Sequence, residues 1–200
     1  MSGSPLQAVE GAIAGDDSKA ARFAGATVSL NNVFSFAPGS DFSFEFWFKP
    51  DDPNAVVGVF SKHGAEPPLN LTVAGYYFTA TKTQTTFTYD PPGGGLPPPT
   101  FKVNGPPPST NAFTHVVVTS DGDSDLSIYV NGEGPTTTLV NPEATSVGLF
   151  LLGTSPDGAF RGALDEFAVY DKVLPAQLVR DHHATGRGTP ARLPRPEALE

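Results

Sequence analysis

The sequence predicts an all-β fold in which antiparallel strands form a sandwich, followed by one short helix near the C-terminus. Glycine and proline each occur 21 times in 200 residues, whereas charged residues make up only 16%. This composition is typical of many strands joined by turns. Apolar residues recur at every second position in several short segments, and these segments follow one another too closely for helical crossovers. A chain of this length is expected to form a single core.

The strongest strand signal lies at residues 42–48, where four phenylalanines alternate with Ser43, Glu45 and Trp47. Alternation with a period of two indicates a strand with one buried face. Burying each phenylalanine contributes at most roughly 1.5–3 kcal/mol. We therefore place this strand near the centre of a sheet, with Trp47 on the face opposite the phenylalanines.

Further strands are predicted from the same alternation. One or two short strands fall around Gly25 in residues 20–31, and the others are predicted at residues 56–61, 69–73, 76–81, 85–89, 114–120, 126–131 and 147–152. The strands at 114–120 and 126–131 flank a polar turn and are expected to form a hairpin. Asn131-Gly132 then suits a type I′ turn, which needs positive φ angles.

One helix is predicted to start at Pro175, because proline favours the first helical position, and to stop before Gly186, because glycine favours a C-terminal cap. Leu174, Leu178 and His182 fall on one face of this helix. Residues 187–200 contain prolines and arginines without an apolar period, and are predicted to be a linker or tail.

Residues 91–108 contain eight prolines and four glycines. Proline cannot donate to a sheet ladder, so this segment is predicted to be a loop insertion with room for one edge strand at residues 100–103. Two interpretations stay open for the loop: a solvated segment without a specific role, or the rim of a binding site.

Four segments resemble the laminin-G-like, concanavalin-A-like jelly-roll domains, in the order in which that family carries them. They are Ala21-Arg22-Phe23, residues 42–50, residues 113–132 with Tyr129-Val130-Asn131-Gly132, and residues 162–178, where a strand runs into a short helix. The resemblance implies an antiparallel two-sheet jelly-roll sandwich at residues 20–186. Residues 1–19 are then a lead-in that can supply a first strand.

The charge balance limits the partners. The chain has 21 acidic and 12 basic residues, a formal charge of −9, which disfavours binding to nucleic acid or to an anionic membrane surface. No apolar run of eighteen residues occurs, so no membrane insertion is expected. The absence of cysteine excludes disulfides and thiolate metal sites. The resemblance implies an extracellular, cell-surface or virion-associated location.

The chain is not expected to be an enzyme. Laminarinase-type members of the fold carry their carboxylates as Glu-x-Asp-x-x-Glu, and this spacing is absent. Glu45 is alone on its strand, and Glu166 has only Asp165 beside it, which is predicted to point to the opposite face. No Gly-x-Ser-x-Gly motif accompanies the histidines. A glycoside hydrolase is therefore a minor alternative.

The histidines have simpler explanations than metal binding. Adjacent helical residues point about 100° apart, so His182 and His183 are not expected to share an ion. In the resembling family, a ring residue at this place in the last helix serves packing. His115 alternates with apolar residues, which predicts a satisfied histidine in the sheet or core.

Asp165 is the candidate metal ligand. On a regular strand Asp165 points to the same face as Phe167 and Val169, because the three residues are two positions apart. It is therefore predicted to be buried on an apolar side and to need a partner. That partner is either an arginine such as Arg22 or Arg161, or a loop amide. Alternatively, the resemblance implies calcium, because several relatives bind calcium through the Asp of this motif.

A second acidic segment at residues 121–125 imitates the start of an EF-hand loop, but Leu126 takes the place of the required glycine. An ordinary acidic turn and a weak calcium site both stay open for it.

Sugar recognition needs exposed aromatic faces beside short polar side chains. The candidate ligand-binding residues are Tyr76, Tyr77, Tyr89, Phe101 and Asn104. Core packing is the alternative for each aromatic residue. Together these observations predict a non-catalytic recognition or adhesion module that binds a glycan or a surface protein, within a larger bacterial or phage surface protein. A structural spacer, tail or decoration domain with self-association is the alternative.

Overall fold

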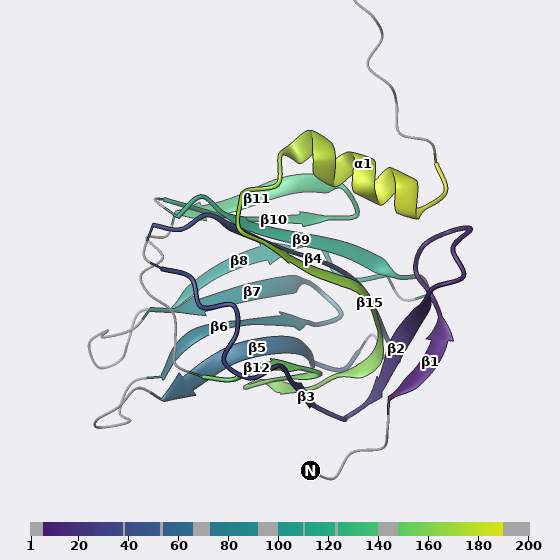
Figure 1. Cartoon of the computed structure of the whole chain (residues 1–200), viewed down its shortest axis with the longest axis horizontal. Coiled ribbons are helices and arrows are strands. Elements are labelled where there is room, and N and C mark those ends of the chain that lie inside the picture. The colour runs from purple at the N-terminus through teal and green to yellow at the C-terminus, as the bar shows by residue number, and fades with distance from the viewer. Residues whose placement is uncertain are drawn as a thin grey trace, which may run out of the picture.

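The computed structural model describes residues 6–37, 39–52, 54–65, 73–91, 100–109, 111–122, 124–139 and 148–189. These residues form two stacked antiparallel sheets with a helix on the outer side of one of them (Figure 1). This arrangement confirms the predicted jelly-roll sandwich. A third, two-stranded sheet pairs β13 (Thr154–Ser155) with β14 (Gly158–Ala159). Within these ranges no helix is long and apolar enough to span a lipid bilayer.

Sheet A has seven strands in the order β1, β2, β15, β4, β9, β10 and β11. In that order they are Gln7–Glu10, Lys19–Ala24, Arg161–Tyr170, Phe42–Pro50, Thr114–Ser120, Asp125–Val130 and Glu133–Leu139. The predicted hairpin of β9 and β10 is confirmed. Asn131 and Gly132 both have positive φ, as predicted for the turn. This turn leads into β11, a strand that the sequence analysis missed.

Sheet B has six strands in the order β3, β12, β5, β6, β7 and β8. In that order they are Val28–Ser29, Phe150–Leu152, Val57–Ala65, Val73–Ala80, Thr85–Asp90 and Phe101–Gly105. β8 is the edge strand expected inside the proline-rich segment, of which residues 92–99 lie outside the described residues. The strand predicted at 69–73 also lies there, except for Val73, the first residue of β6.

The core lies between the sheets and is built from aromatic rings. The four phenylalanines of β4 point inward. Phe46 contacts Phe60 and Phe78 of sheet B edge-to-face, with ring centroids 5.5 and 5.0 Å apart. Edge-to-face pairs are favoured because the positive edge of one ring meets the negative face of the other. The prediction that β4 is a central strand is therefore confirmed.

The opposite face of β4 is also buried, which a period of two alone does not predict. Helix α1 (Ala176–Gly186) lies across this side of sheet A (Figure 1). Leu174 and Val179 pack against Val117 and Tyr129 of the sheet. The predicted apolar face is wrong for Leu178, which is 36% exposed.

The ends of α1 differ from those predicted. Pro175 is the N-terminal cap rather than the first helical residue, and Gly186 is inside the helix. The left-handed glycine is Gly188, with a φ of 72°. Its amide donates to Thr185 O, and the Thr189 amide donates to Ala184 O, which is a Schellman motif.

A β-bulge in β15 determines which face its acids occupy. Asp165 pairs with Trp47, but the next pair is Ala168 with Glu45, so two residues of β15 oppose one residue of β4. Glu166 takes the left-handed conformation, with a φ of 49°. The bulge reverses the alternation. The prediction that Asp165 shares a face with Phe167 is therefore wrong, because Asp165 lies on the Trp47 side while Phe167 packs on the core.

Candidate functional site

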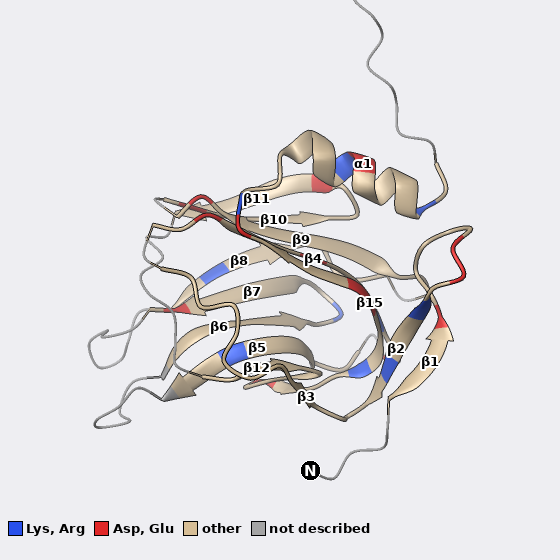
Figure 2. Cartoon of the chain, in the orientation of Figure 1, with Lys and Arg blue, Asp and Glu red and all other residues tan. Residues whose placement is uncertain are grey.

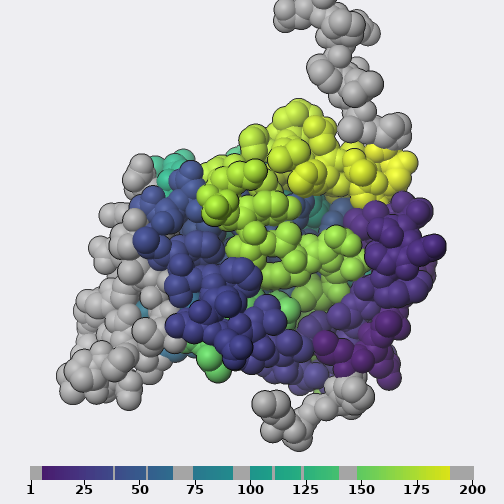
Figure 3. Space-filling model, viewed as in Figure 1, coloured from purple at the N-terminus to yellow at the C-terminus, as the bar shows by residue number. Residues whose placement is uncertain are grey.

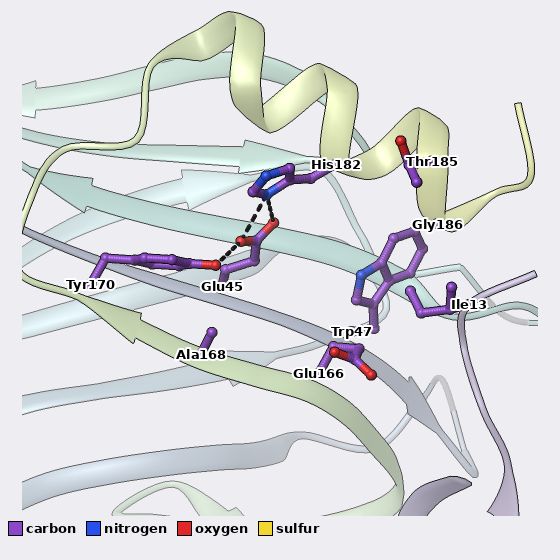
Figure 4. Close-up of a pocket in the computed structure, with 9 residues that line it drawn as sticks. All are labelled: Ile13, Glu45, Trp47, Glu166, Ala168, Tyr170, His182, Thr185 and Gly186. Atoms are coloured by element: carbon purple, nitrogen blue, oxygen red, sulfur yellow. Dashed lines mark hydrogen bonds and ion pairs between the residues drawn. The ribbon is translucent and has the colours of Figure 1, made fainter. Parts of the chain in front are cut away.

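Glu45 is the centre of a hydrogen-bond network on the outer side of sheet A. His115 Nε2 of β9 and His182 Nδ1 of α1 donate to Oε1 over 2.8 and 2.9 Å. The Tyr170 hydroxyl of β15 donates to Oε2 over 2.8 Å. One carboxylate therefore joins three elements that are far apart in the sequence. Figure 4 shows two of its partners, His182 and Tyr170.

The network keeps Glu45 ionised. Burial by itself would raise the pKa of its carboxyl, but the hydrogen bonds from His115, Tyr170 and His182 lower the pKa to about 2. Burial and the neighbouring carboxylate raise the pKa of Tyr170 to about 12. Glu45 therefore accepts hydrogen bonds at neutral pH and has no proton to donate.

Three rings hold the C-terminal half of α1 on the sheet. Trp47 lies against His115 with centroids 4.7 Å apart and against His183 with centroids 5.6 Å apart. Gly186 meets the same indole, and a Cβ there would lie 2.5 Å from Trp47 Cζ2. His182 and His183 thus contact different partners. His115 is buried in the sheet as expected, but it is only partly satisfied, because its Nδ1 is buried without a hydrogen-bond partner within the described residues.

A pocket of about 270 Å³ opens beside this network, between α1, β15 and the N-terminal loop. Figure 3 shows the three segments meeting, with the helix in yellow, the closing strand in green and the N-terminal segment in purple. Trp47, Ala168, Tyr170 and Glu166 line it (Figure 4). Burial and the carboxylates of Asp165, Asp16 and Glu45 raise the pKa of Glu166. The pocket is therefore acidic, and its one buried carboxylate, Glu45, is already hydrogen-bonded within the protein.

The outer face of sheet B is different, because it carries short polar side chains. Three rows cross its strands in register. They are His63, Gly75 and Asp90; Ser61, Tyr77, Thr88 and Lys102; and Thr79, Thr86 and Asn104. We call these residues the polar face. Figure 2 shows uncharged ribbon along the middle of β6 and β7. Most side chains of this face are buried. Lys102 and Asn104 are exposed at its edge, whereas the following members of the face are at most 8% exposed: Ser61, Tyr77, Thr79, Thr86, Thr88 and Asp90.

Gly75 allows a side-chain pair to form across the first row. With no side chain on β6 at this position, His63 Nε2 of β5 reaches Asp90 Oδ2 of β7 over 2.9 Å. Asp90 is only 8% exposed, and its second oxygen, Oδ1, is buried with no hydrogen-bond partner within the described part of the chain. A buried acceptor without a donor is costly. Asp90 Oδ1 is therefore a place for a donor that the described residues do not supply.

Tyr77 lies beside this pair. Its ring meets the His63 ring edge-to-face, with centroids 5.3 Å apart. Burial raises the pKa of the Tyr77 phenol, a hydrogen bond with Thr88 opposes this, and the charges of Asp157 and Asp90 raise the pKa further. The phenol therefore stays protonated at neutral pH, in the field of two carboxylates.

The structure divides the five predicted ligand-binding residues between the two faces of sheet B. Tyr77 and Asn104 belong to the polar face, where Asn104 is exposed and Tyr77 is only 8% exposed. Tyr76 and Tyr89 are buried in the core, and Phe101 packs against it. Tyr76 donates its hydroxyl to Phe34 O over 2.7 Å, so neither buried ring offers a face to a ligand. His63 and Asp90 were missed, because only the strand register brings them together.

Asp165 is buried, at 7% exposed, as predicted. Its partner is a loop amide: Ala12 N donates to Oδ2 over 2.7 Å. Glu166 is on the same outer side rather than on the opposite face, as its place in the pocket shows. The described residues contain no group of three His, Cys, Asp or Glu side chains arranged to hold a metal ion. The calcium role implied by the resemblance stays a prediction.

The second acidic segment forms an ordinary turn around Asp121 Oδ1, which accepts the amides of Ser124 and Asp125. Asp123 lies outside the described residues.

Solved structures share this fold. The binding domain of Paraclostridial Mosquitocidal Protein 1 gives a TM-score of 0.67 at 15% identity, over 90% of this chain and 46% of that one. Domain 4 of AbnA, an extracellular arabinanase from Geobacillus stearothermophilus solved with arabinotriose, gives 0.62 at 19% identity, over 90% and 81%. The CBM40 of the Ruminococcus gnavus IT-sialidase, bound to α2,3-sialyllactose, gives 0.57 at 12% identity, over 78% and 97%.

The chain spans less than half of the mosquitocidal binding domain, so that similarity concerns one part of a larger unit. No curated protein sequence gives a significant match. The model of the concanavalin A-like lectin/glucanase superfamily, in its laminin-G form, matches residues 23–180. Together with the two-sheet jelly roll, this match shows that the chain belongs to the concanavalin A-like lectin/glucanase superfamily.

Proposed function

We propose that this chain is a non-catalytic carbohydrate-recognition module that acts outside the cell and binds a glycan through the polar face of sheet B. The observation that carries the proposal is the composition of that face. Rows of hydroxyl and amide side chains surround Tyr77 and the His63–Asp90 pair. Sugars are recognised by such groups, because they offer many hydroxyls beside C–H-rich ring faces.

The limited exposure of these side chains also favours a lectin-like role. Side chains that are at most 8% exposed give a single sugar few contacts, so each site is expected to bind weakly and to depend on several copies for avidity. The arabinanase domain and the CBM40 were solved with bound oligosaccharides on the same fold. These similarities support the class of ligand, while the binding residues are proposed from this chain alone.

The absence of catalysis is part of the proposal. Glycoside hydrolysis needs one carboxyl that donates a proton and a second that acts as a base or nucleophile. Glu45 is held ionised by three donors. On the polar face, one oxygen of Asp90 is already paired with His63. Neither group is placed as a free general acid.

A glycan array tests the proposal. The chain would be displayed multivalently and screened in calcium and again in chelator. We expect reproducible binding to a set of related glycans. A silent array from correctly folded protein would refute glycan recognition and favour the structural or protein-binding alternative. A matched pair of variants, Tyr77→Ala on the polar face and Thr185→Ala beside the α1 pocket, locates the site, because only the first should lose binding.

A further inference from the structure

The polar face contains one charged group whose hydrogen bonding is incomplete. Asp90 Oδ2 is paired with His63, while Oδ1 is buried without a partner within the described residues. Each carboxylate oxygen can accept two hydrogen bonds. The missing partner must therefore donate a proton, as a sugar hydroxyl does, and a carboxylate or sulfate group on a ligand cannot do so.

The charges around Asp90 also favour a neutral ligand over an acidic one. Asp90 and Asp157 both act on the Tyr77 phenol, so this part of the face is negative. The nearest cation in the register of the face is Lys102, on the edge strand β8 opposite Thr88. The chain as a whole carries a formal charge of −9. An anionic sugar would approach against this field.

We infer that the polar face selects neutral sugars over acidic ones, and that Asp90 determines this selectivity by accepting a sugar hydroxyl at Oδ1. His63 acts as a positioning residue, because its bond to Oδ2 across Gly75 fixes the carboxylate. Oδ1 is covered in the unbound chain, so binding requires the surrounding side chains to shift, as is common at interfaces. This inference rests on the proposed glycan-binding function and adds the class of sugar.

The first test compares matched neutral and acidic sugars. Lactose and α2,3-sialyllactose differ by one acidic residue, and the array provides many such pairs. We expect every reproducible hit to be a neutral glycan, with sialylated, sulfated or uronic counterparts bound at least tenfold more weakly. Affinity for a neutral hit should also stay constant as sodium chloride rises, because ionic strength screens charge–charge attraction only. Hits confined to acidic glycans, or binding that weakens steeply with salt, would overturn the inference and leave glycan recognition standing.

The second test assigns the role of Asp90. Asp90→Asn keeps the shape of the side chain and removes its charge. Binding of the strongest array hit, measured by calorimetry, should fall about tenfold or more, since a hydrogen bond to a charged group is worth about 1.5–3 kcal/mol. Asp17→Asn, which removes an exposed carboxylate from the N-terminal loop, is the matched control and should bind like the wild type.

The outcomes separate the two proposals. A hit that binds Asp90→Asn as tightly as the wild type would overturn the assignment of Asp90, while the module would still bind glycans. Should Asp90→Asn not fold, Tyr77→Phe tests the same site, because it removes only the hydroxyl next to Thr88 and Asp90. Unchanged binding by Tyr77→Phe would then overturn the inference. No glycan binding at all would refute the proposed function itself.

Discussion

Replacing Glu45 by glutamine should destabilise the fold strongly at neutral pH and weakly in acid. The substitution keeps the size of the side chain and removes its charge. Glutamine presents one acceptor and one NH₂ group to the three donors of His115, Tyr170 and His182. Two of these contacts therefore weaken or turn repulsive, and α1 loses part of its attachment to sheet A.

The magnitude follows from the pKa of Glu45, which falls from 4.5 to about 2 on folding. Each pKa unit corresponds to about 1.4 kcal/mol, so the ionised network is worth about 3 kcal/mol. Because the folded pKa is the lower one, this stability is fully present above about pH 4.5. It is lost as the pH falls through about 2, below which the carboxyl is protonated in both states.

The assay is urea unfolding of the wild type and Glu45→Gln at several pH values. We expect a gap in the free energy of unfolding of about 2–3 kcal/mol from pH 5 to 7, or roughly 5–10 °C in melting temperature. The gap should close toward pH 2. Glu10→Gln, at an exposed position of β1, is the control and should show no gap. A gap below about 1 kcal/mol at pH 7, or one that does not change with pH, would refute the reasoning.

Three further predictions concern the same side of sheet A. Asp165→Ala removes the acceptor of the Ala12 amide and should cost about 1–3 kcal/mol; a melting temperature within about one degree of the wild type would contradict its buried, partnered role. Gly186→Ala should lower the melting temperature, because a Cβ 2.5 Å from Trp47 Cζ2 costs more than the gain of about 1 kcal/mol in helix propensity; an unchanged or higher value would mean that the indole yields freely. Melting in millimolar calcium and in chelator should give the same temperature, since the described donors around Asp165 do not form a metal site; a clear rise in calcium would support the role implied by the resemblance.

The sequence was sufficient for most of the fold because the core strands obey simple alternation. The phenylalanines of β4 and the Asn131-Gly132 turn each follow a local rule, and the structure agrees with both. β11 was missed because its residues, Glu133–Leu139, are mostly exposed and lack an apolar period. The end of α1 was placed one residue early because Gly186 looked like a cap, whereas it is the last helical residue and packs under Trp47.

The site was less predictable, because it depends on strand register and on one irregularity. The partners of Glu45 come from β9, β15 and α1, and no local pattern indicates that they meet. The bulge at Glu166 places Asp165 on the outer face of sheet A, with Trp47. The alternation of apolar residues in the sequence does not reveal a bulge. His63 and Asp90 are 27 residues apart and meet because the strand register places them on either side of Gly75.

The two outer faces of the sandwich therefore differ in a way that bears on function. On sheet A, α1 covers the central strands, and the buried carboxylate there is satisfied by three elements of the protein itself. That network stabilises the fold, because all of its hydrogen bonds to the carboxylate are internal, although His115 Nδ1 is buried without a partner within the described residues. On sheet B, the described residues cover the middle strands with small polar groups and leave one carboxylate oxygen unfilled. A protein that only needed stability would gain by filling or removing that acceptor. Its presence beside Tyr77 is best explained if a partner from outside the chain completes it, which is why the glycan site is proposed on sheet B rather than in the pocket under the helix.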